Sequence, residues 1–303
     1  MNKNKIFLFV NEIWNQLKIQ YKKIKYLSIL KYFFLFLVSL VLIFPFFLMF
    51  NFSLKSNEEI IENSILSLPK CWYNFDNYRK AYEFFNFFRY FLNTCIMVFF
   101  STLLGTLCCI LTAFALSMFN FRSKSIIISL LILSLMITSE TLVLTNYRTV
   151  SSLGMVNNGK GSDLPGGVYF AMVLPYIVNV VHILILIKTF KIIPKELYYT
   201  AKIDGTTDWQ YLWKILVPIT KGTLLITIIF RIVAAWNAYS WPELVGGEML
   251  TNMSRKKFNN ETGIDEVNVQ MAVAVLINLP LFFIFVFFKK YIVSGDNSSG
   301  IKG

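Results

Sequence analysis

The sequence predicts an all-α polytopic membrane protein with six transmembrane helices. Of its 303 residues, 56% are hydrophobic and only 15% are charged, and the mean hydropathy is +0.58. The apolar residues fall into blocks close to the roughly 20 residues that an α-helix needs to cross a bilayer. Because a helix satisfies its own backbone hydrogen bonds in lipid, blocks of this length predict helices. The predicted spans are Tyr32–Asn51, Phe91–Met118, Ser125–Tyr147, Val168–Ile187, Gly222–Trp241 and Val269–Phe288.

The segments between these spans support the same division. The first span has no small-residue cleavage site and reaches full bilayer length, so we expect a retained anchor and not a removed signal peptide. A long polar loop, residues 52–90, follows it and contains Leu68-Pro69, which interrupts any helix there. The second and third spans are joined only by Phe119–Lys124, which predicts that they pack antiparallel.

The positions of the basic residues predict the orientation of the chain. Segments assigned to the inside carry 18 Lys and Arg residues, the longer outside loops carry ten, and one arginine lies within a span. Cytoplasmic loops of membrane proteins carry this excess, so both termini are expected in the cytoplasm. This placement also accounts for the net charge of +12, so nucleic acid is not expected as a partner. The expected divisions are a cytoplasmic N-terminal segment (1–31), the first helix with its outer loop (32–90), a transmembrane core (91–290) and a cytoplasmic tail (291–303).

The sequence contains no arrangement typical of catalysis or metal binding. The four cysteines are scattered without paired spacing. The one histidine, His182, lies in an apolar run, where packing or a position at a pore edge is favoured over catalysis. The stretch Gly154–Gly161 is one residue short of a P-loop and carries Gly161 where Ser or Thr would hold Mg²⁺. It is predicted to lie outside, so we interpret it as coincidence, and ATP hydrolysis would require another subunit.

The polar segment Pro194–Pro218, between the fourth and fifth spans, is the most informative feature. Its opening proline suits the first turn of a helix, and Gly205 suits the end of that helix because glycine accepts a positive φ. Thr207 and Gln210, three residues apart, form the pattern of a capping box that starts a second helix. The segment is therefore expected to form a helix–turn–helix element at the membrane surface, on which another protein docks.

Two ionisable residues lie deep in predicted spans, where each costs about 2–3 kcal/mol or more unless it faces protein or water. Glu140 lies in the third span among serine and threonine residues, and Arg231 lies near the middle of the fifth. They could line a hydrated path for a polar solute, or form an intersubunit ion pair or snorkel to the interface. The hydroxyl neighbours of Glu140 favour the path, whereas the sequence favours neither interpretation for Arg231. An Arg231 that faced the pore would favour an anionic solute.

The outer end of the fifth span carries Trp236-Asn237 followed by Tyr239. Aromatic residues are expected at the interface of any membrane protein, but that does not explain the amide. Aromatic faces beside an amide suit a sugar, which has apolar C–H faces and many hydroxyl groups. The candidate translocation path therefore consists of Glu140, Arg231, Trp236, Asn237 and Tyr239.

The chain resembles a known family from about Leu68 to its C-terminus. The spacing of the loop residues Ala201, Gly205, Ile215 and Pro218 is similar to that of the EAA loop in permeases of binding-protein-dependent ABC importers. The resemblance is to the carbohydrate branch, and within it to the second permease of maltose-type and glycerol-phosphate-type systems. Further matching motifs are Leu68-Pro69, Asn77-Tyr78-Arg79, Phe91-Leu92-Asn93-Thr94, Leu174-Pro175-Tyr176, Ile203-Asp204-Gly205 and Leu279-Pro280.

This resemblance implies the type I ABC importer transmembrane fold, in the plasma membrane, with both termini inside. The implied solute is a sugar, an oligosaccharide or a glycerol-phosphate-like molecule. The implied partners are a second related permease, two ATP-binding subunits and an extracellular solute-binding protein, all working with a lipid bilayer. No cofactor is expected on this chain, because ATP and Mg²⁺ would bind to the partner ATPase. The residues implied to couple this chain to the ATPase are Tyr199, Ala201, Ile203, Asp204, Gly205, Trp213, Ile215 and Pro218.

The chain departs from the family pattern at several places, among them Ala238, where a carboxylate is usual, and an apparent insertion at Asn158–Pro165. Tyr198 and Tyr199 stand where glutamates are usual, so docking is expected to rest more on aromatic packing than on ion pairs. The prolines usual in the middle of the third span are replaced by serine and threonine within residues 138–145, which predicts a less kinked helix.

The alternatives to a sugar importer permease are an ATP-independent transporter or channel, a membrane scaffold, and an ABC permease for a polyamine, phosphonate or peptide.

Overall fold

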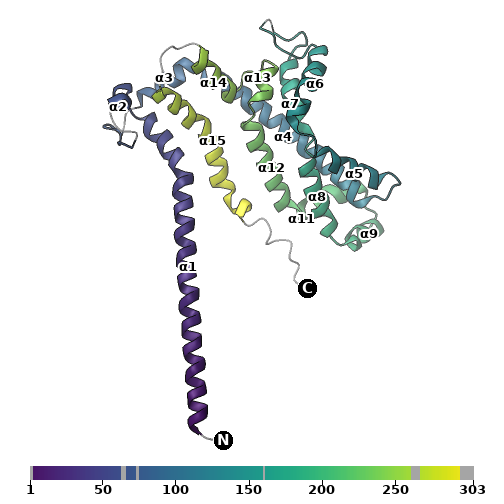
Figure 1. Cartoon of the computed structure of the whole chain (residues 1–303). Helices are drawn as coiled ribbons and strands as arrows, with labels where there is room; N and C mark the ends of the chain where they lie inside the picture. The colour runs from purple at the N-terminus through teal and green to yellow at the C-terminus, as the bar shows by residue number, and fades with distance from the viewer. Residues whose placement is uncertain (1–2, 63–65, 73–74, 160, 261–266, 294–303) are drawn as a thin grey trace. The chain divides into compact units, whose positions relative to one another are not determined.

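The computed structural model describes residues 3–62, 66–72, 75–159, 161–260 and 267–293, and within these ranges the chain is helical with no strand (Figure 1). The predicted all-α class is confirmed. The helices are α1 (Lys3–Ser53), α2 (Asn57–Glu62), α3 (Asp76–Phe85), α4 (Phe87–Met118), α5 (Lys124–Ser134), α6 (Ser139–Ser152), α7 (Gly167–Ile177), α8 (Val180–Ile192), α9 (Lys195–Ile203), α10 (Asp208–Tyr211), the π-helix η1 (Leu212–Leu216), α11 (Val217–Ile219), α12 (Lys221–Trp236), α13 (Ser240–Leu244), α14 (Leu250–Asn260) and α15 (Val267–Val293).

The chain forms two compact units, Met1–Asn77 with Val267–Ala272, and Tyr78–Glu266 with Val273–Gly303. The first unit is held together by buried amide groups. Asn77 Nδ2 donates to the backbone oxygen of Ser53 at 2.9 Å and to that of Lys55 at 2.8 Å. Asn268 Nδ2 donates to Asn77 Oδ1 at 2.9 Å. These bonds join the end of α1 to the first turn of α15.

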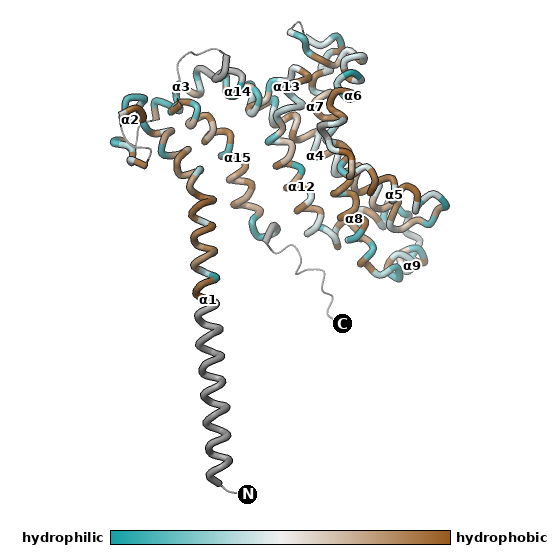
Figure 2. Tube along the Cα trace, viewed as in Figure 1, coloured by the Kyte–Doolittle hydropathy of each residue, from teal (hydrophilic) through white to brown (hydrophobic). Residues whose placement is uncertain are grey.

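The second unit is built around α4, which packs against α7, α8 and α12 (Figure 1). Within the most apolar stretch of α4, 44% of the residues are buried, and Cys109 and Ala113 are completely buried. The most apolar 18-residue window within Ser28–Ser53 of α1 has no buried residue, and this part of the helix is hydrophobic along most of its length (Figure 2). A helix that is apolar all round suits a lipid environment, whereas α4 forms the centre of a protein core.

In the part of the chain that the structure describes, three helices are long and apolar enough to cross a membrane: Ser28–Ser53, Phe87–Met118 and Val267–Tyr291. They coincide with the first, second and sixth predicted spans. Two bent pairs, α7 with α8 and α10–α11 with α12, each qualify as one interrupted span, with bends of 47° and 83°. The described residues therefore hold three to five candidate spans. The count of six and the cytoplasmic position of both termini stay predictions.

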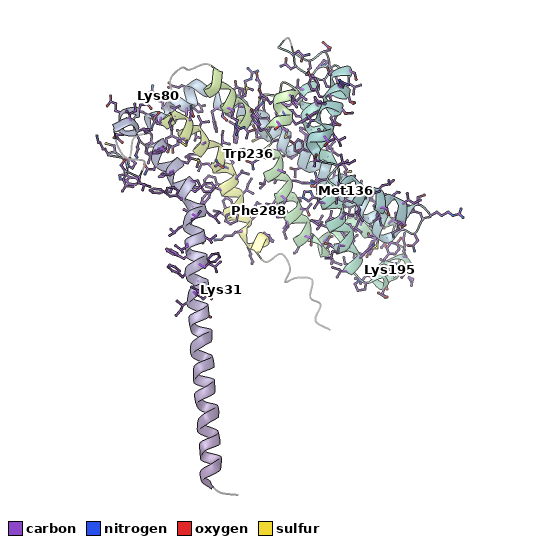
Figure 3. All side chains as sticks on the ribbon, in the orientation of Figure 1. Lys31, Lys80, Met136, Lys195, Trp236 and Phe288 are labelled. Carbon is purple, nitrogen blue, oxygen red and sulfur yellow. The ribbon has the colours of Figure 1, made fainter. Side chains whose placement is uncertain are left out.

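The third predicted span is interrupted, so the expectation of a less kinked helix is wrong. Helix α5 ends at Ser134 and α6 begins at Ser139. Ser134 Oγ donates to the backbone oxygen of Leu131, and Thr138, at the start of α6, has a ψ of 148°. Serine and threonine compete with the helix for backbone partners, so a helix can end here without proline. Met136, labelled in Figure 3, lies in this break and is 81% exposed.

The fourth span is interrupted at Val178 and Asn179. Pro175 lies in the last turn of α7, and its ring disfavours a straight continuation of the helix. Asn179 then caps α8, because its side-chain oxygen accepts a hydrogen bond from the backbone N–H of His182 at 3.1 Å. The break leaves the last carbonyl groups of α7 without partners inside the helix.

Candidate functional site

The segment Pro194–Pro218 forms the predicted helix–turn–helix element. Helix α9 begins directly after Pro194 and ends at Ile203. Gly205 follows with a φ of 78°, and its N–H bonds to the Lys202 oxygen at 3.0 Å. The N–H of Thr206 bonds to the oxygen of Ala201, also at 3.0 Å. This pair of bonds is the Schellman arrangement, which requires a residue that tolerates a positive φ.

The second half of the element starts with the predicted capping box. Thr207 Oγ1 accepts from the Gln210 N–H at 3.2 Å, and the Thr207 N–H donates to Gln210 Oε1 at 3.0 Å. The chain then passes through the π-helix η1, in which the N–H of Val217 bonds to the oxygen of Leu212. Such π turns occur mostly singly and often near functional sites. A bend of 83° separates this half from α12.

One face of the element is built into the core of the second unit. Ala201, Tyr211 and Leu212 are 5%, 0% and 1% exposed, and they belong to the cluster that contains Phe114 of α4 and Phe190 of α8. The small side chain of Ala201 allows α9 to approach this cluster closely. A displacement of the element must therefore displace α4 and α8 as well, because a close-packed core transmits strain.

Several large apolar side chains of the element are exposed. We define the exposed patch as Leu197, Tyr199, Ile203 and Trp209, which are 43%, 57%, 86% and 60% exposed. Lys195, labelled in Figure 3, marks the start of α9. An exposed group of large apolar residues on a small polar element is typical of an interaction site.

The remaining predicted coupling residues lie elsewhere on the element. Asp204 and Gly205 form the exposed turn, and Pro218 is exposed in α11. Trp213 and Ile215 are half-buried against the core, with the Trp213 ring 5.6 Å from that of Trp209.

Tyr198 does not lie in the exposed patch, in contrast to its expected use as a docking anchor. Its hydroxyl donates to Asp208 Oδ1 at 2.6 Å, and its ring packs against that of Tyr211 at 5.0 Å. Lys202 Nζ lies 2.8 Å from the same carboxylate oxygen. Burial, together with the hydrogen bond to Asp208, raises the pKa of Tyr198 to about 12, so the hydroxyl stays protonated and remains a donor. The three side chains join α9 to α10.

We expect the change Tyr198→Phe to lower the stability of the protein by about 0.5–1.5 kcal/mol, the usual net value of one hydrogen bond. The ring and its packing remain, so only the bond to Asp208 is lost. The measurement is the Tm of the purified protein in detergent. The matched control is Tyr199→Phe, because that neighbouring hydroxyl is on the exposed face and its removal should leave the Tm unchanged. Equal Tm values for the two variants would show that the bond contributes nothing.

Arg231 is buried in the second unit and bonds to the end of α7. It is 5% exposed, and its Nη1 donates to the Tyr176 oxygen at 2.8 Å. Its Nη2 donates to the Ile177 oxygen at 3.3 Å and lies 2.9 Å from Cys109 Sγ. The acceptors are the carbonyl groups freed by the break before α8, and the C-terminal end of a helix favours a cation. Gly105 provides the room, because a Cβ at this position would overlap the guanidinium group.

A cavity of about 390 Å³ lies beside the break in the fourth span. Its volume falls within the range of small-molecule sites. The cavity has both polar and apolar walls. The lining residues are Ser101, Leu142, Val143, Asn146, Pro175, Tyr176, Val178, Asn179, His182, Arg231, Ala234, Ala235 and Trp241.

Among the described side chains of the predicted translocation path, one lines this cavity. Arg231 lines it, whereas Trp236 lines a larger apolar groove and donates from Nε1 to the Ile277 oxygen at 3.1 Å. Asn237 is exposed and bonds back to the Val233 oxygen, and the Tyr239 ring lies 4.6 Å from the guanidinium carbon of Arg255. Glu140 belongs to α6, but its side chain lies outside the described residues.

Sequence reasoning missed the polar residues that meet Arg231 at the cavity. Asn146 and Asn179 were hidden in long apolar blocks, and His182 was expected only as a packed or pore-edge residue. His182 is 8% exposed, and its Nδ1 has no hydrogen-bond partner among the described residues. The available signal was the pair Pro175 and Asn179, a helix breaker followed by a helix cap.

The described helices and their central core define a multi-pass membrane protein, and the fold is that of an ABC importer membrane subunit. A chain in the crystal structure of a bacterial ABC transporter involved in the import of the acidic polysaccharide alginate superimposes with a TM-score of 0.76. The two sequences are 18% identical, and the match covers 88% of this chain and 96% of that chain. The chain belongs to the family of binding-protein-dependent transport system inner membrane components, whose sequence profile matches residues 21–295.

Several proteins of known role are similar in sequence. The arabinooligosaccharides transport system permease protein AraQ of Bacillus subtilis is 26% identical over 280 residues, which is 89% of this chain and 94% of that protein. The diacetylchitobiose uptake system permease protein NgcG of Streptomyces coelicolor is 25% identical over 270 residues, with coverages of 88% and 86%. This chain is therefore the membrane component of a transport system that depends on a binding protein.

Proposed function

We propose that this chain is the permease subunit of an ATP-driven importer for a sugar or oligosaccharide. The observation that carries the proposal is the 194–218 element, which buries Ala201, Tyr211 and Leu212 in the core with α4 and α8 and leaves the large apolar side chains of the exposed patch accessible. The similar permeases for arabinooligosaccharides and diacetylchitobiose support a carbohydrate solute. The partners would be a related permease, a pair of ATP-binding subunits and an extracellular binding protein.

The mechanism follows from the two faces of the element. The exposed patch seats in the ATPase, which binds ATP and Mg²⁺ and closes. The closing motion moves α9 and α10 as one body, because Tyr198, Lys202 and Asp208 join them. The buried face passes the motion to α4 and α8, and the spans open to one side of the membrane at a time. Both termini and the 194–218 element lie in the cytoplasm.

Crosslinking tests this docking directly. We expect Ile203→Cys, in a background with the exposed Cys71 replaced by serine, to form a crosslink to the ATP-binding subunit in membranes. Ile61→Cys is the matched control, because Ile61 is 84% exposed, close to the 86% of Ile203, but lies in the predicted outer loop. A crosslink from residue 61 and none from residue 203 would contradict both the docking surface and the orientation.

A further inference from the structure

We propose that the second unit binds the headgroup of an anionic phospholipid at the corner where α5, α8 and α9 meet. The site is the basic cluster, which we define as Lys124, Lys191 and Lys195. Lys124 is the first residue of α5, Lys191 lies in the last turn of α8, and Lys195 is the first residue of α9. Lipid binding at this corner does not depend on the transport function proposed above, because it requires only this chain and a membrane.

The basic cluster comes from two distant parts of the sequence. Helix α5 contacts α8, and α9 begins only two residues after α8 ends (Figure 1). The ammonium group of Lys124 is fixed in place, because Nζ donates to the Phe119 oxygen at 2.9 Å and to the Ser117 oxygen at 3.4 Å. These carbonyl groups lie at the C-terminal end of α4, which favours a cation. The side chains of Lys191 and Lys195 are exposed and free to meet a ligand.

The positive charge of the basic cluster is not balanced by the described part of the chain. Burial, together with the ammonium groups of Lys191 and Lys195, lowers the pKa of Lys124, which lies just before the third predicted span. Ion pairs between described residues involve none of these three lysines. Glu196 follows Lys195 in the first turn of α9, and one carboxylate does not offset three ammonium groups. A bound phosphate would relieve the repulsion between them.

The surface beside the basic cluster is apolar, which favours a lipid over a soluble anion. Every residue of α5 is at least partly exposed, and Ile126 and Leu130 are each more than half exposed. Ile192, at the end of α8, is exposed to the same degree. Because the third predicted span begins at Ser125, Lys124 lies at the level of the lipid headgroups. Lysines at this level of the cytoplasmic leaflet attract anionic lipids, and the acyl chains then lie along α5.

The number of lysines indicates which anionic lipid fits best. Three ammonium groups match the two phosphates of cardiolipin better than the single phosphate of phosphatidylglycerol. Basic sites between transmembrane helices on the cytoplasmic side are typical of cardiolipin binding. Lys195, labelled in Figure 3, also belongs to the 194–218 element, so a bound headgroup ties the start of α9 to the membrane surface.

The test measures lipid binding to the purified full-length chain, without its partner subunits. The chain in detergent is titrated with cardiolipin, phosphatidylglycerol or phosphatidylcholine, and bound lipid is counted by native mass spectrometry. The variant combines Lys191→Gln and Lys195→Gln, which removes two exposed charges and leaves Lys124 on its carbonyl partners. The matched control combines Lys70→Gln and Lys80→Gln, which removes two exposed lysines from the predicted outer loop.

We expect the unchanged chain to bind cardiolipin more tightly than phosphatidylglycerol, and both more tightly than phosphatidylcholine. The Lys191 and Lys195 double variant should bind cardiolipin about 30-fold more weakly, roughly fivefold for each lysine, while the control keeps the affinity of the unchanged chain. Equal affinity for the three lipids, or equal weakening in the variant and the control, would overturn the proposal.

Two further measurements separate the lipid from other anions. Inorganic phosphate, added at the same concentration as the lipid phosphate, should leave cardiolipin bound, because it lacks the acyl chains that contact α5. Complete displacement by inorganic phosphate would overturn the lipid assignment in favour of a soluble anion. Loss of binding to an ATP-binding subunit in the double variant, with cardiolipin affinity unchanged, would overturn it in favour of that subunit.

Discussion

Replacing Arg231 with methionine is expected to abolish uptake and to lower the Tm of the purified protein by roughly 5–15 °C. Methionine is similar in length but has no donors, so the Tyr176 and Ile177 oxygens lose their partners. Each buried carbonyl left unpaired costs about 1–3 kcal/mol, and each kcal/mol lowers the Tm of a protein of this size by about 2–4 °C. The end of α7 would then no longer be held at the position that shapes the cavity.

A thiol label supplies a second measurement of the same change. Cys109 is completely buried and lies 2.9 Å from Arg231 Nη2, so a membrane-permeant maleimide should label it in Arg231→Met and not in the unchanged protein. The matched control is Arg148→Met, which removes an exposed arginine from α6 and should alter neither the Tm nor the labelling. An unchanged Tm together with a protected Cys109 in Arg231→Met would show that the guanidinium group does not hold α7.

Gly105→Ala tests the same contact from the other side. A Cβ at residue 105 would overlap the guanidinium group, so Arg231 must leave its carbonyl partners even though its charge is retained. We expect this variant to reproduce the labelling of Cys109. If Cys109 is labelled in both Arg231→Met and Gly105→Ala, its exposure results from the lost bonds between Arg231 and α7, and not from the lost charge.

The 194–218 element could be predicted from the sequence because its signals are local. A proline before the first helix, Gly205 after it, and the pair Thr207 and Gln210 act within one or two turns of the chain. The structure places each of these where the local rules require it. What the sequence could not predict was the side-chain direction of the two tyrosines. Tyr198 bonds to Asp208 and Tyr199 is exposed, and only the packing of α9 on the core distinguishes them.

The cavity could not be predicted in the same way because it depends on breaks inside apolar blocks. Hydropathy averages over a window of residues, so the interruptions at 135–138 and 178–179 were read as continuous helix. Arg231 was recognised as unusual, yet its partners are backbone carbonyls that exist only because α7 ends at Ile177. A backbone carbonyl that becomes available at a helix end has no sequence signature. The role of Glu140, Trp236, Asn237 and Tyr239 in the translocation path stays a prediction.

Gly205→Val is expected to abolish solute-stimulated ATP hydrolysis in the reconstituted importer. Gly205 has a φ of 78°, and a Cβ at this position would contact nothing within 4 Å, so the substitution changes the backbone and not the packing. A β-branched residue is a severe outlier at this φ, and the left-handed conformation costs about 1–2 kcal/mol even for ordinary residues. The Schellman bonds would be lost, and α9 would no longer hold the exposed patch at a fixed angle to α10.

Gly205→Asn separates this backbone effect from a clash with the docked partner. Asparagine is bulkier than alanine but tolerates a positive φ, so we expect Gly205→Asn to retain most of the stimulation and Gly205→Ala to lose part of it. If asparagine and valine are equally damaging, the partner lies against the turn and side-chain size is the cause. If Gly205→Val leaves the stimulation of ATP hydrolysis unchanged, the motion does not depend on the angle between α9 and α10. The core contacts of Ala201 and Tyr211 would then have to transmit the motion of the ATPase, and the ATPase would have to dock on a surface other than the exposed patch.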